Sequence, residues 1–346
     1  MGADNFKPMD APRYCGIPTF MRTPHVTDFS TLDIALAGVP YDGAVEARSG
    51  ARQGPRQIRD MSSMMRAIHH VTRINPYELC RVGDVGDVNF ERIFDVEASH
   101  ADITHFFQKL HAAGVMPLSA GGDHSITLPI MRAIAAHHPV GLVHIDAHTD
   151  CCDEEMNSKY SHGTPFRRAV EEGLLDPQRT IQIGIRGAAN SSECWDFGPQ
   201  HGIRIIYIEE FARLGAEQVI AEARRVVGNG PTYLSFDVDG IDPAFTPGTG
   251  TPEIGGLTPL EAQTLIRGLR GLNLVGADVV EVSPPFDPSG NTALVAATMM
   301  YEILCILSET KNGRCQEPGI CRQAVECKSC VMRGKPPFRA EGFCDL

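Results

Sequence analysis

The sequence contains no run of 18 or more apolar residues, so it predicts no membrane-spanning helix. Its first twenty residues, MGADNFKPMDAPRYCGIPTF, lack the basic start and apolar stretch of a secretion signal. Positive charge is also scarce, because 31 Lys and Arg stand against 43 Asp and Glu, for a net charge of -12. A surface of that sign repels nucleic acid and anionic membranes, so we expect neither as a partner. The composition fits a cytoplasmic protein that binds a small cationic substrate.

The cysteines do not form an evident disulfide framework. There are eleven of them, an odd number, and no secretion signal precedes them. Disulfides are typical of oxidising compartments, whereas cytosolic thiols stay reduced. We therefore expect reduced thiols throughout the chain.

The 346 residues are enough for one large α/β domain with flanking segments. Residues 1–30 are interrupted by four prolines and predict an irregular N-terminal arm. Residues 31–310 form the predicted domain, and residues 311–346 a tail rich in Cys, Gly, Pro and Arg. In that tail the pair Cys327 and Cys330 lacks the second pair of a zinc ribbon, which leaves a small zinc site and a contact with a neighbouring subunit both open.

Short apolar runs alternate with amphipathic segments along the predicted domain. Continuous Val, Ile and Leu runs are typical of parallel strands covered on both faces. Alternation of strand and helix predicts a doubly wound parallel sheet in a three-layer α/β/α domain. The expected strands are Leu32–Val39, Val115–Ser119, Gly141–Ile145, Thr180–Ile185, Ile203–Ile208, Thr232–Phe236 and Leu272–Val280, and the expected helices are Ser99–Ala113, Ile126–His137, Thr164–Glu172, Ala216–Val227 and Thr258–Leu269.

Chemically unusual segments follow four of these strands. They are Gly-Gly-Asp-His-Ser at 121–125, Asp-Ala-His-Thr-Asp at 146–150, Asp-Val-Asp-Gly at 237–240, and Glu281. Ligands of open parallel sheets bind beyond the carboxyl ends of the strands, so these segments should converge on one crevice.

The residue types in these segments indicate a metal centre. Alternate residues at a strand end point to the same side, which groups the three polar side chains of 146–150 and the two of 237–239. So many neighbouring carboxylates repel one another unless cations neutralise them. Two divalent ions match six ligands, whereas one tetrahedral zinc would not need them, and mixed carboxylate and imidazole ligands suit Mn²⁺, Ni²⁺, Fe²⁺ or Zn²⁺. The candidate ligands are His124, Asp146, His148, Asp150, Asp237 and Asp239.

Taken singly, an Asp-x-Asp pair is usually a turn and a Gly-Gly-Asp-His segment usually a loop. Their combination in order along the chain resembles the three signature motifs of the ureohydrolases, the arginase and agmatinase family, from about Leu32 to Leu307. The segment His-Gly-Thr-Pro-Phe-Arg-Arg at 162–168 is similar to the agmatinase and guanidinoalkanoate hydrolase branch.

The resemblance implies an arginase-like fold and hydrolysis of a guanidino C–N bond by a hydroxide that bridges two metal ions, releasing urea and an amine. It implies that His124, Asp146, Asp150 and Asp237 hold one ion, and that Asp146, His148, Asp237 and Asp239 hold the other. Glu281 would bind the guanidinium, and His162 would act as the proton shuttle. The resemblance also implies a homo-trimer or hexamer, with a hetero-oligomer left open.

The chain departs from the family pattern on the substrate side. Cys151 and Cys152 follow the second motif, where they either reshape the substrate site or are two small buried side chains. Residues 44–49, which include Glu46, replace small hydroxylated residues. The substrate is therefore agmatine, a guanidino acid or an atypical guanidine, with Mn²⁺ or Ni²⁺ as the metal. The alternative is a nickel-dependent guanidine or biguanide (metformin-type) hydrolase, working with or without a partner subunit. A non-catalytic subunit of the same fold is a further hypothesis.

Overall fold

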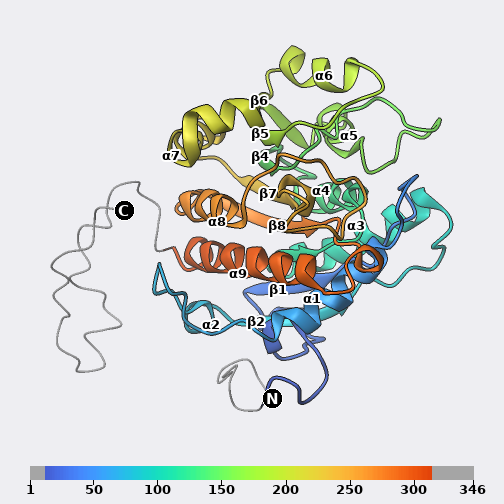
Figure 1. The fold of residues 1–346 in the computed structure, drawn as a ribbon. Coiled ribbons are helices and arrows are strands. Elements are labelled where there is room, and N and C mark those ends of the chain that lie inside the picture. The colour runs from blue at the N-terminus through green and yellow to red at the C-terminus, as the bar shows by residue number, and fades with distance from the viewer. Residues whose placement is uncertain (1–11, 314–346) are drawn as a thin grey trace, which may run out of the picture.

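The structure, a computed structural model, describes residues 12–313. Within them, eight strands form one sheet in which all neighbours are parallel. The strands are β1 (Ile34–Gly38), β2 (Val82–Asp87), β3 (Met116–Ala120), β4 (Val140–Ile145), β5 (Leu175–Ile185), β6 (Arg204–Tyr207), β7 (Thr232–Asp237) and β8 (Leu274–Val280). Their spatial order is β2-β1-β3-β8-β7-β4-β5-β6, which crosses the molecule from bottom to top in Figure 1.

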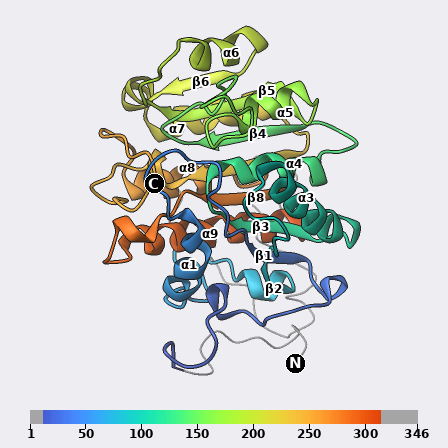
Figure 2. The same ribbon diagram turned by 90° about the vertical axis from the view of Figure 1, so that its right-hand side faces the viewer.

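Helices cover both faces of the sheet (Figures 1 and 2). One layer contains α1 (Gly54–Ser62), α2 (Pro76–Leu79), α7 (Ile208–Val227), α8 (Pro259–Gly268) and α9 (Asn291–Lys311), and the other contains α3 (Val96–Ala112), α4 (Thr127–Ile134), α5 (Pro165–Glu171) and α6 (Glu193–His201). The expected three-layer, doubly wound α/β fold is confirmed.

The strands supply both layers because successive side chains point to opposite faces. On β1, Ile34 and Leu36 belong to the core beneath α1 and α9, whereas Ala35 and Ala37 belong to the core beneath α3 and α4. All five residues of this strand are buried. Burial on both faces explains why the apolar runs are continuous rather than alternating.

The sequence interpretation missed one strand and several helices. The strand β2 was not expected, because its sequence Val-Gly-Asp-Val-Gly-Asp lacks an apolar run. Asp84 within it is nevertheless buried, where Arg59 Nε donates to its carboxylate at 2.8 Å. Helices α6 and α9 were not expected either, and α7 begins at Ile208 rather than Ala216 because a kink at Gly215, with φ of 76°, joins two helical segments.

By length and composition, α9 alone among the helices of residues 12–313 could cross a membrane. In the fold, 78% of its most apolar window is buried. It packs on α1, α8 and β8, and its apolar character therefore belongs to a core helix.

Residues 12–30 of the expected arm hold short turns, including a 3-10 helix at Phe20–Arg22. Val26 ties this segment to the sheet by donating its N–H to the Asp84 carbonyl at 2.8 Å. The tail cysteines, for which a zinc site was considered, lie outside the described residues.

Candidate metal centre and substrate cavity

The candidate site lies beyond the carboxyl ends of four adjacent central strands, β3, β8, β7 and β4. His124 follows β3 and Glu281 follows β8. Asp237 is the last residue of β7, and Asp146 follows β4 directly. Strand order thus brings together motifs that are up to 157 residues apart in the sequence.

Three carboxylates surround one ring nitrogen of His124. Its Nδ1 atom lies 2.8 Å from Asp150 Oδ2, 3.1 Å from Asp146 Oδ2 and 3.1 Å from Asp237 Oδ2. These four residues are the set that the family resemblance implied for one ion.

A second group of potential ligands shares Asp146 with the first. His148 Nδ1 lies 3.3 Å from Asp239 Oδ2 and 3.4 Å from Asp146 Oδ1. Potential ligand atoms of Asp146, His148 and Asp239 all lie within 4.8 Å of one another. Asp237 contacts this group as well, because its Oδ1 accepts the Asp239 N–H at 2.8 Å.

The chemistry of these donors fits divalent cations. His124 Nδ1 is buried and has no hydrogen-bond partner of acceptable geometry, although it faces three carboxylate oxygens. Burial, together with the charges of Asp239 and Asp146, raises the pKa of Asp237 well above its usual value. Burial and the Asp146 charge raise the pKa of Asp239 to about 6. No Lys or Arg is among the described residues that line the adjoining cavity, so bound cations would supply the missing positive charge.

Buried hydrogen bonds orient His124. Its Nε2 lies 2.8 Å from the Ser235 hydroxyl, which donates to Asp278 at 2.6 Å. Tyr233 and Thr127 also donate their hydroxyls to the Asp278 carboxylate. Nε2–H therefore faces an oxygen and leaves Nδ1 as the free ligand atom, the usual arrangement of a metal-binding histidine.

His144 plays the same orienting role for Asp146. The Gln182 amide donates to His144 Nδ1 at 3.1 Å, so the proton of this imidazole is on Nε2, 2.7 Å from Asp146 Oδ2. Gln182 and Asp278 lie inside strands, where the sequence gives no sign that they support a site.

Glu281 is held between the metal motifs and the cavity. It adopts φ of 66°, which is unusual for a non-glycine residue. Its Oε1 atom accepts the backbone N–H of His124 at 2.8 Å. Oε2 is buried without a hydrogen-bond partner, and the side chain lines the cavity. Such an oxygen is a ready acceptor for a cationic ligand.

His162 lies between two carboxylates. Its Nδ1 is 3.4 Å from Glu281 Oε1, and its Nε2 is 2.9 Å from Glu46 Oε2. Burial alone would lower the pKa of His162, but Glu281 and Glu46 outweigh it and raise the pKa well above 6.5.

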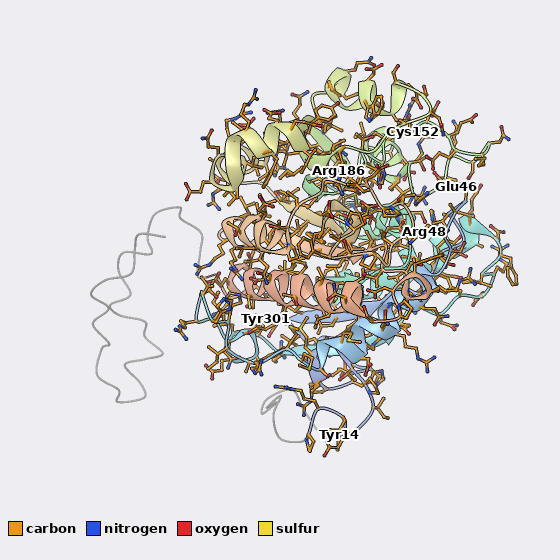
Figure 3. The ribbon with its side chains drawn as sticks, in the orientation of Figure 1. Tyr14, Glu46, Arg48, Cys152, Arg186 and Tyr301 are labelled. Atoms are coloured by element: carbon orange, nitrogen blue, oxygen red, sulfur yellow. A yellow bond between two sulfur atoms is a disulfide. The ribbon has the colours of Figure 1, made fainter. Side chains whose placement is uncertain are left out.

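The cavity in front of these groups has a volume of about 530 Å³. Glu46 and Cys152, both in its lining, lie on the same side of the molecule (Figure 3). Cys151 is fully buried and contacts Gln182 rather than the cavity, so of the two cysteines proposed for substrate binding only Cys152 lines the cavity.

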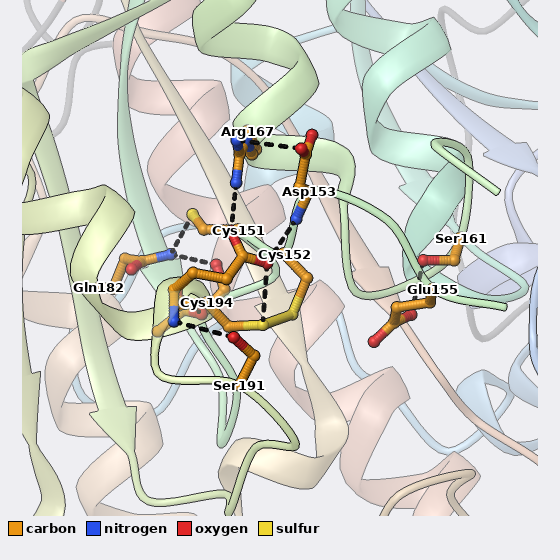
Figure 4. The surroundings of a disulfide bond; sticks show 11 residues. Cys151, Cys152, Asp153, Glu155, Ser161, Arg167, Gln182, Ser191 and Cys194 are labelled. Carbon is orange, nitrogen blue, oxygen red and sulfur yellow. Dashed lines mark hydrogen bonds and ion pairs between the residues drawn. A yellow bond between two sulfur atoms is a disulfide. The ribbon is translucent and has the colours of Figure 1, made fainter. Parts of the chain in front are cut away.

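Cys152 forms a disulfide with Cys194 (Figure 4). The expectation that all cysteines are reduced is therefore wrong for this pair. The two residues are 42 positions apart, and only the packing of the α6 start against the second metal motif brings their Cα atoms to 4.2 Å.

Asp242, Asp287 and Ser283 stabilise loops that neighbour the site. Asp242 accepts the backbone N–H groups of Gly255 and Gly256. Asp287 accepts the Thr292 N–H in the first turn of α9, and Ser283 donates to the Arg48 carbonyl. Arg186 was not expected, yet it donates to the carbonyls of residues 239–241 and 253, and so fixes the loop beside the metal ligands.

Comparisons with known proteins agree with this geometry. The sequence model of the Arginase family matches residues 32–305. Guanidinopropionase of Pseudomonas aeruginosa is 60% identical over 314 residues, covering 90% of this chain and 98% of that protein. Guanidinobutyrase of the same organism is 48% identical, covering 86% and 94%. The solved structure of proclavaminate amidino hydrolase from Streptomyces clavuligerus superimposes with a TM-score of 0.84 at 39% identity, covering 87% of this chain and all of that chain.

The chain belongs to the arginase family. It is a hydrolase that acts on guanidino C–N bonds and has a His and Asp ligand cluster suited to the dinuclear metal site of that family. The expected enzyme class and branch are confirmed, whereas the guanidine and biguanide alternative is not favoured.

Proposed function

We propose that the substrate is a short guanidino acid of the 3-guanidinopropionate type, hydrolysed to urea and the corresponding amino acid. Support comes from the relative that is 60% identical along almost its whole length and is named for that substrate. A cavity of about 530 Å³ accommodates a molecule of this size with room for water.

The observation that carries the proposal is the unpartnered Glu281 Oε2 beside two groups of metal ligands. A guanidinium group presents parallel N–H donors that match a carboxylate. Glu281 Oε1 is already fixed by His124, so the carboxylate is held in one orientation before the substrate arrives. Binding there would place the guanidinium carbon next to the metal centre, which lowers the entropic part of the barrier.

The proposed metal is Mn²⁺, because four of the six proposed ligands are carboxylates and hard oxygen donors favour it over softer ions. Two such ions, when bound, would lower the pKa of water toward neutrality and so provide a hydroxide nucleophile at physiological pH. The residues that would hold them are His124, Asp146, His148, Asp150, Asp237 and Asp239.

His162 is the proposed general acid. With Glu46 accepting from Nε2–H, its second proton is on Nδ1, which faces Glu281 and the guanidinium position. Transfer of that proton would let the amine leave as a neutral group. Glu46 accepts from Nε2–H, and its negative charge stabilises the protonated imidazole until the proton leaves from Nδ1.

The far end of the substrate would meet Asn190 and Ser191, which line the cavity and offer neutral hydrogen-bond donors for a carboxylate. A second candidate substrate, agmatine, is favoured by a different observation. Four further carboxylates line the cavity and would attract its second positive charge, namely Glu154, Glu155, Glu193 and Glu253.

Urea release separates these candidates. The enzyme, loaded with Mn²⁺ or Ni²⁺ in parallel, would be offered 3-guanidinopropionate, 4-guanidinobutyrate, agmatine, arginine, guanidine and metformin. We expect the highest kcat/KM for 3-guanidinopropionate with Mn²⁺. A preference for agmatine would instead indicate that the four further carboxylates of the cavity determine substrate choice. If no compound released urea while two metal ions were bound, the result would favour a non-catalytic subunit.

We further propose that the enzyme is cytoplasmic and assembles as a homo-trimer or hexamer, as the family resemblance implied. Light scattering on the purified full-length chain tests the assembly. A monomer that is fully active would contradict it, and activity only after addition of a second protein would point to a hetero-oligomer.

A further inference from the structure

The Cys152–Cys194 disulfide connects two walls of the substrate cavity, and both of its cysteines line that cavity. Cys152 follows the metal-ligand candidate Asp150 by two positions. Cys194 lies in the first turn of α6, just after the segment 187–192 that links β5 to this helix. The covalent bond therefore joins the metal motif to the wall that would contact the far end of the substrate (Figure 4).

The segment 187–192 is anchored at its ends and not in its middle. At its start, Gly187 donates its N–H to the Ala147 carbonyl at 2.9 Å. Ala188 and Asn190 in its middle, and Ser191 and Ser192 near its end, are exposed at the protein surface or toward the cavity. Within residues 12–313, no hydrogen bond is recorded for Ala188 or Asn190, whereas Ser191 and Ser192 accept backbone N–H groups from the first turn of α6.

The end of the segment has three attachments. Thr149 donates its hydroxyl to the Cys194 carbonyl at 2.8 Å, and Asp153 donates its N–H to Glu193 at 3.0 Å. Glu193 also pairs with Arg167 on α5. The Cys152–Cys194 disulfide is a fourth attachment and is covalent. Its loss would let the wall formed by 187–192 sample several positions instead of one.

We propose that the Cys152–Cys194 pair is a redox-controlled clamp that sets the position of segment 187–192 and thereby the affinity for substrate. The inference rests on the proposed function, because the wall matters only if the substrate reaches it. Both sulfur atoms belong to residues of the cavity wall, where a small dithiol can approach them.

The chemistry of the clamp is ordinary thiol–disulfide exchange. A thiolate of an external dithiol attacks one sulfur and breaks the S–S bond, which forms a mixed disulfide and a cysteine thiolate. The second thiol of the reagent then displaces the other cysteine. The dithiol is oxidised to a cyclic disulfide. Its two electrons and two protons are transferred to the protein, so that Cys152 and Cys194 become thiols.

Reduction should spare the metal ligands, because other bonds hold the motif in place. Asp150 accepts the Phe166 N–H at 3.1 Å on its carbonyl, and Cys152 donates its own N–H to the Gly163 carbonyl at 3.0 Å. Those contacts are independent of sulfur chemistry. The expected signature is therefore a raised KM with a preserved kcat and an unchanged metal content.

The test compares the metal-loaded full-length enzyme with and without dithiothreitol, alongside Cys152→Ser, Cys194→Ser and the double variant. Thiol alkylation followed by mass spectrometry reports the disulfide, and hydrogen exchange reports the mobility of 187–192. Cys15→Ser is the matched control, because Cys15 is an exposed free thiol that the cavity lining does not include.

On reduction we expect KM for 3-guanidinopropionate to rise roughly tenfold with little change in kcat, and exchange in 187–192 to accelerate. The serine variants should show the raised KM both with and without dithiothreitol. Their lack of response to the reagent would distinguish loss of the disulfide from removal of metal ions by dithiothreitol. The clamp would be overturned if alkylation found Cys152 and Cys194 as free thiols in enzyme that had not been treated with dithiothreitol. It would also be overturned if KM and the hydrogen exchange of 187–192 were the same before and after reduction. Absence of turnover on every guanidino compound would count against the proposed function, while the exchange measurement would still decide the clamp.

Discussion

His162 and Glu46 form an ion pair at the cavity, with 2.9 Å between His162 Nε2 and Glu46 Oε2. The pair lies opposite Glu281, which is 3.4 Å from the other ring nitrogen. The hydrogen bond from His162 lowers the pKa of Glu46 to about 2, so this carboxylate stays ionised in the working pH range. Glu46 is also one of the residues at which we expected the chain to depart from the family pattern.

Glu46→Gln should weaken proton donation by His162. Because Glu46 helps to raise the pKa of His162, its neutralisation lowers that pKa, and the protonated form is lost at a lower pH. We expect kcat to fall about tenfold near neutrality and the basic limb of the kcat–pH profile to move to lower pH. Steady-state kinetics between pH 6 and pH 10 check this.

The control for this variant is Glu97→Gln, which neutralises an exposed carboxylate in the first turn of α3. It should leave the profile in place. A Glu46→Gln enzyme with an unshifted basic limb would show that Glu46 does not act through the imidazole.

Asp146→Ala should abolish turnover, because Asp146 belongs to both groups of potential ligands. We expect the metal content to fall below two ions per chain and activity to drop by about 10³-fold or more. Elemental analysis of the purified variant, together with urea release, provides the measurement. Two tightly bound ions in this variant would contradict the bridging role.

The sequence was sufficient to predict seven of the eight strands and the gathering of the candidate ligands. The Asp146 and Asp237 motifs each follow an apolar strand, and parallel strands bring such ends together whatever their distance along the chain. Neither the edge strand β2 nor helix α6 could be predicted in the same way, because β2 is rich in Gly and Asp and α6 contains Pro199.

Contacts between side chains that are distant along the chain could not be predicted from the sequence, for a different reason. Cys152 and Cys194 look like unrelated thiols until α6 packs against the metal motif. The link from His124 through Ser235 to Asp278 likewise depends on the register of β7 and β8, which places Ser235 beside Asp278. Local patterns report which face a residue occupies, but not which residue lies across from it.

Ser235→Ala should weaken metal binding without altering any proposed ligand. The variant removes the oxygen that faces His124 Nε2 and leaves Asp278 with its two other donors. Loss of such an orienting partner typically lowers metal affinity by about 10- to 100-fold. Titration of the metal-free protein with Mn²⁺ should show one weakened site, with activity restored at high Mn²⁺. Activity that stays low at saturating Mn²⁺ would argue for a role beyond orientation.

A buried ion pair far from the metal centre makes stability depend on pH. Glu302 on α9 is 3% exposed, receives the Arg267 guanidinium in two contacts, and lies 2.9 Å from His69 Nε2. Burial would raise its pKa, but the bonds to His69 and Arg267 outweigh that effect, so the pKa of Glu302 is lowered from 4.5. A lowered carboxyl pKa in the folded state gives stability that is fully present above pH 4.5 and is lost as the pH falls through the folded pKa.

Glu302→Gln should therefore destabilise the fold at neutral pH, because it leaves the half-buried Arg267 guanidinium without its partner. The expected cost is about 3 kcal/mol, the usual range for breaking a buried pair. Thermal unfolding of both proteins at pH 7 and in steps below pH 4.5 should show the difference narrowing with acid, since protonation then removes the same charge from the parent. Glu217→Gln, at an exposed position on α7, should match the parent at every pH. A difference that stays constant with pH would mean that packing of the side chain, and not its charge, stabilises this region.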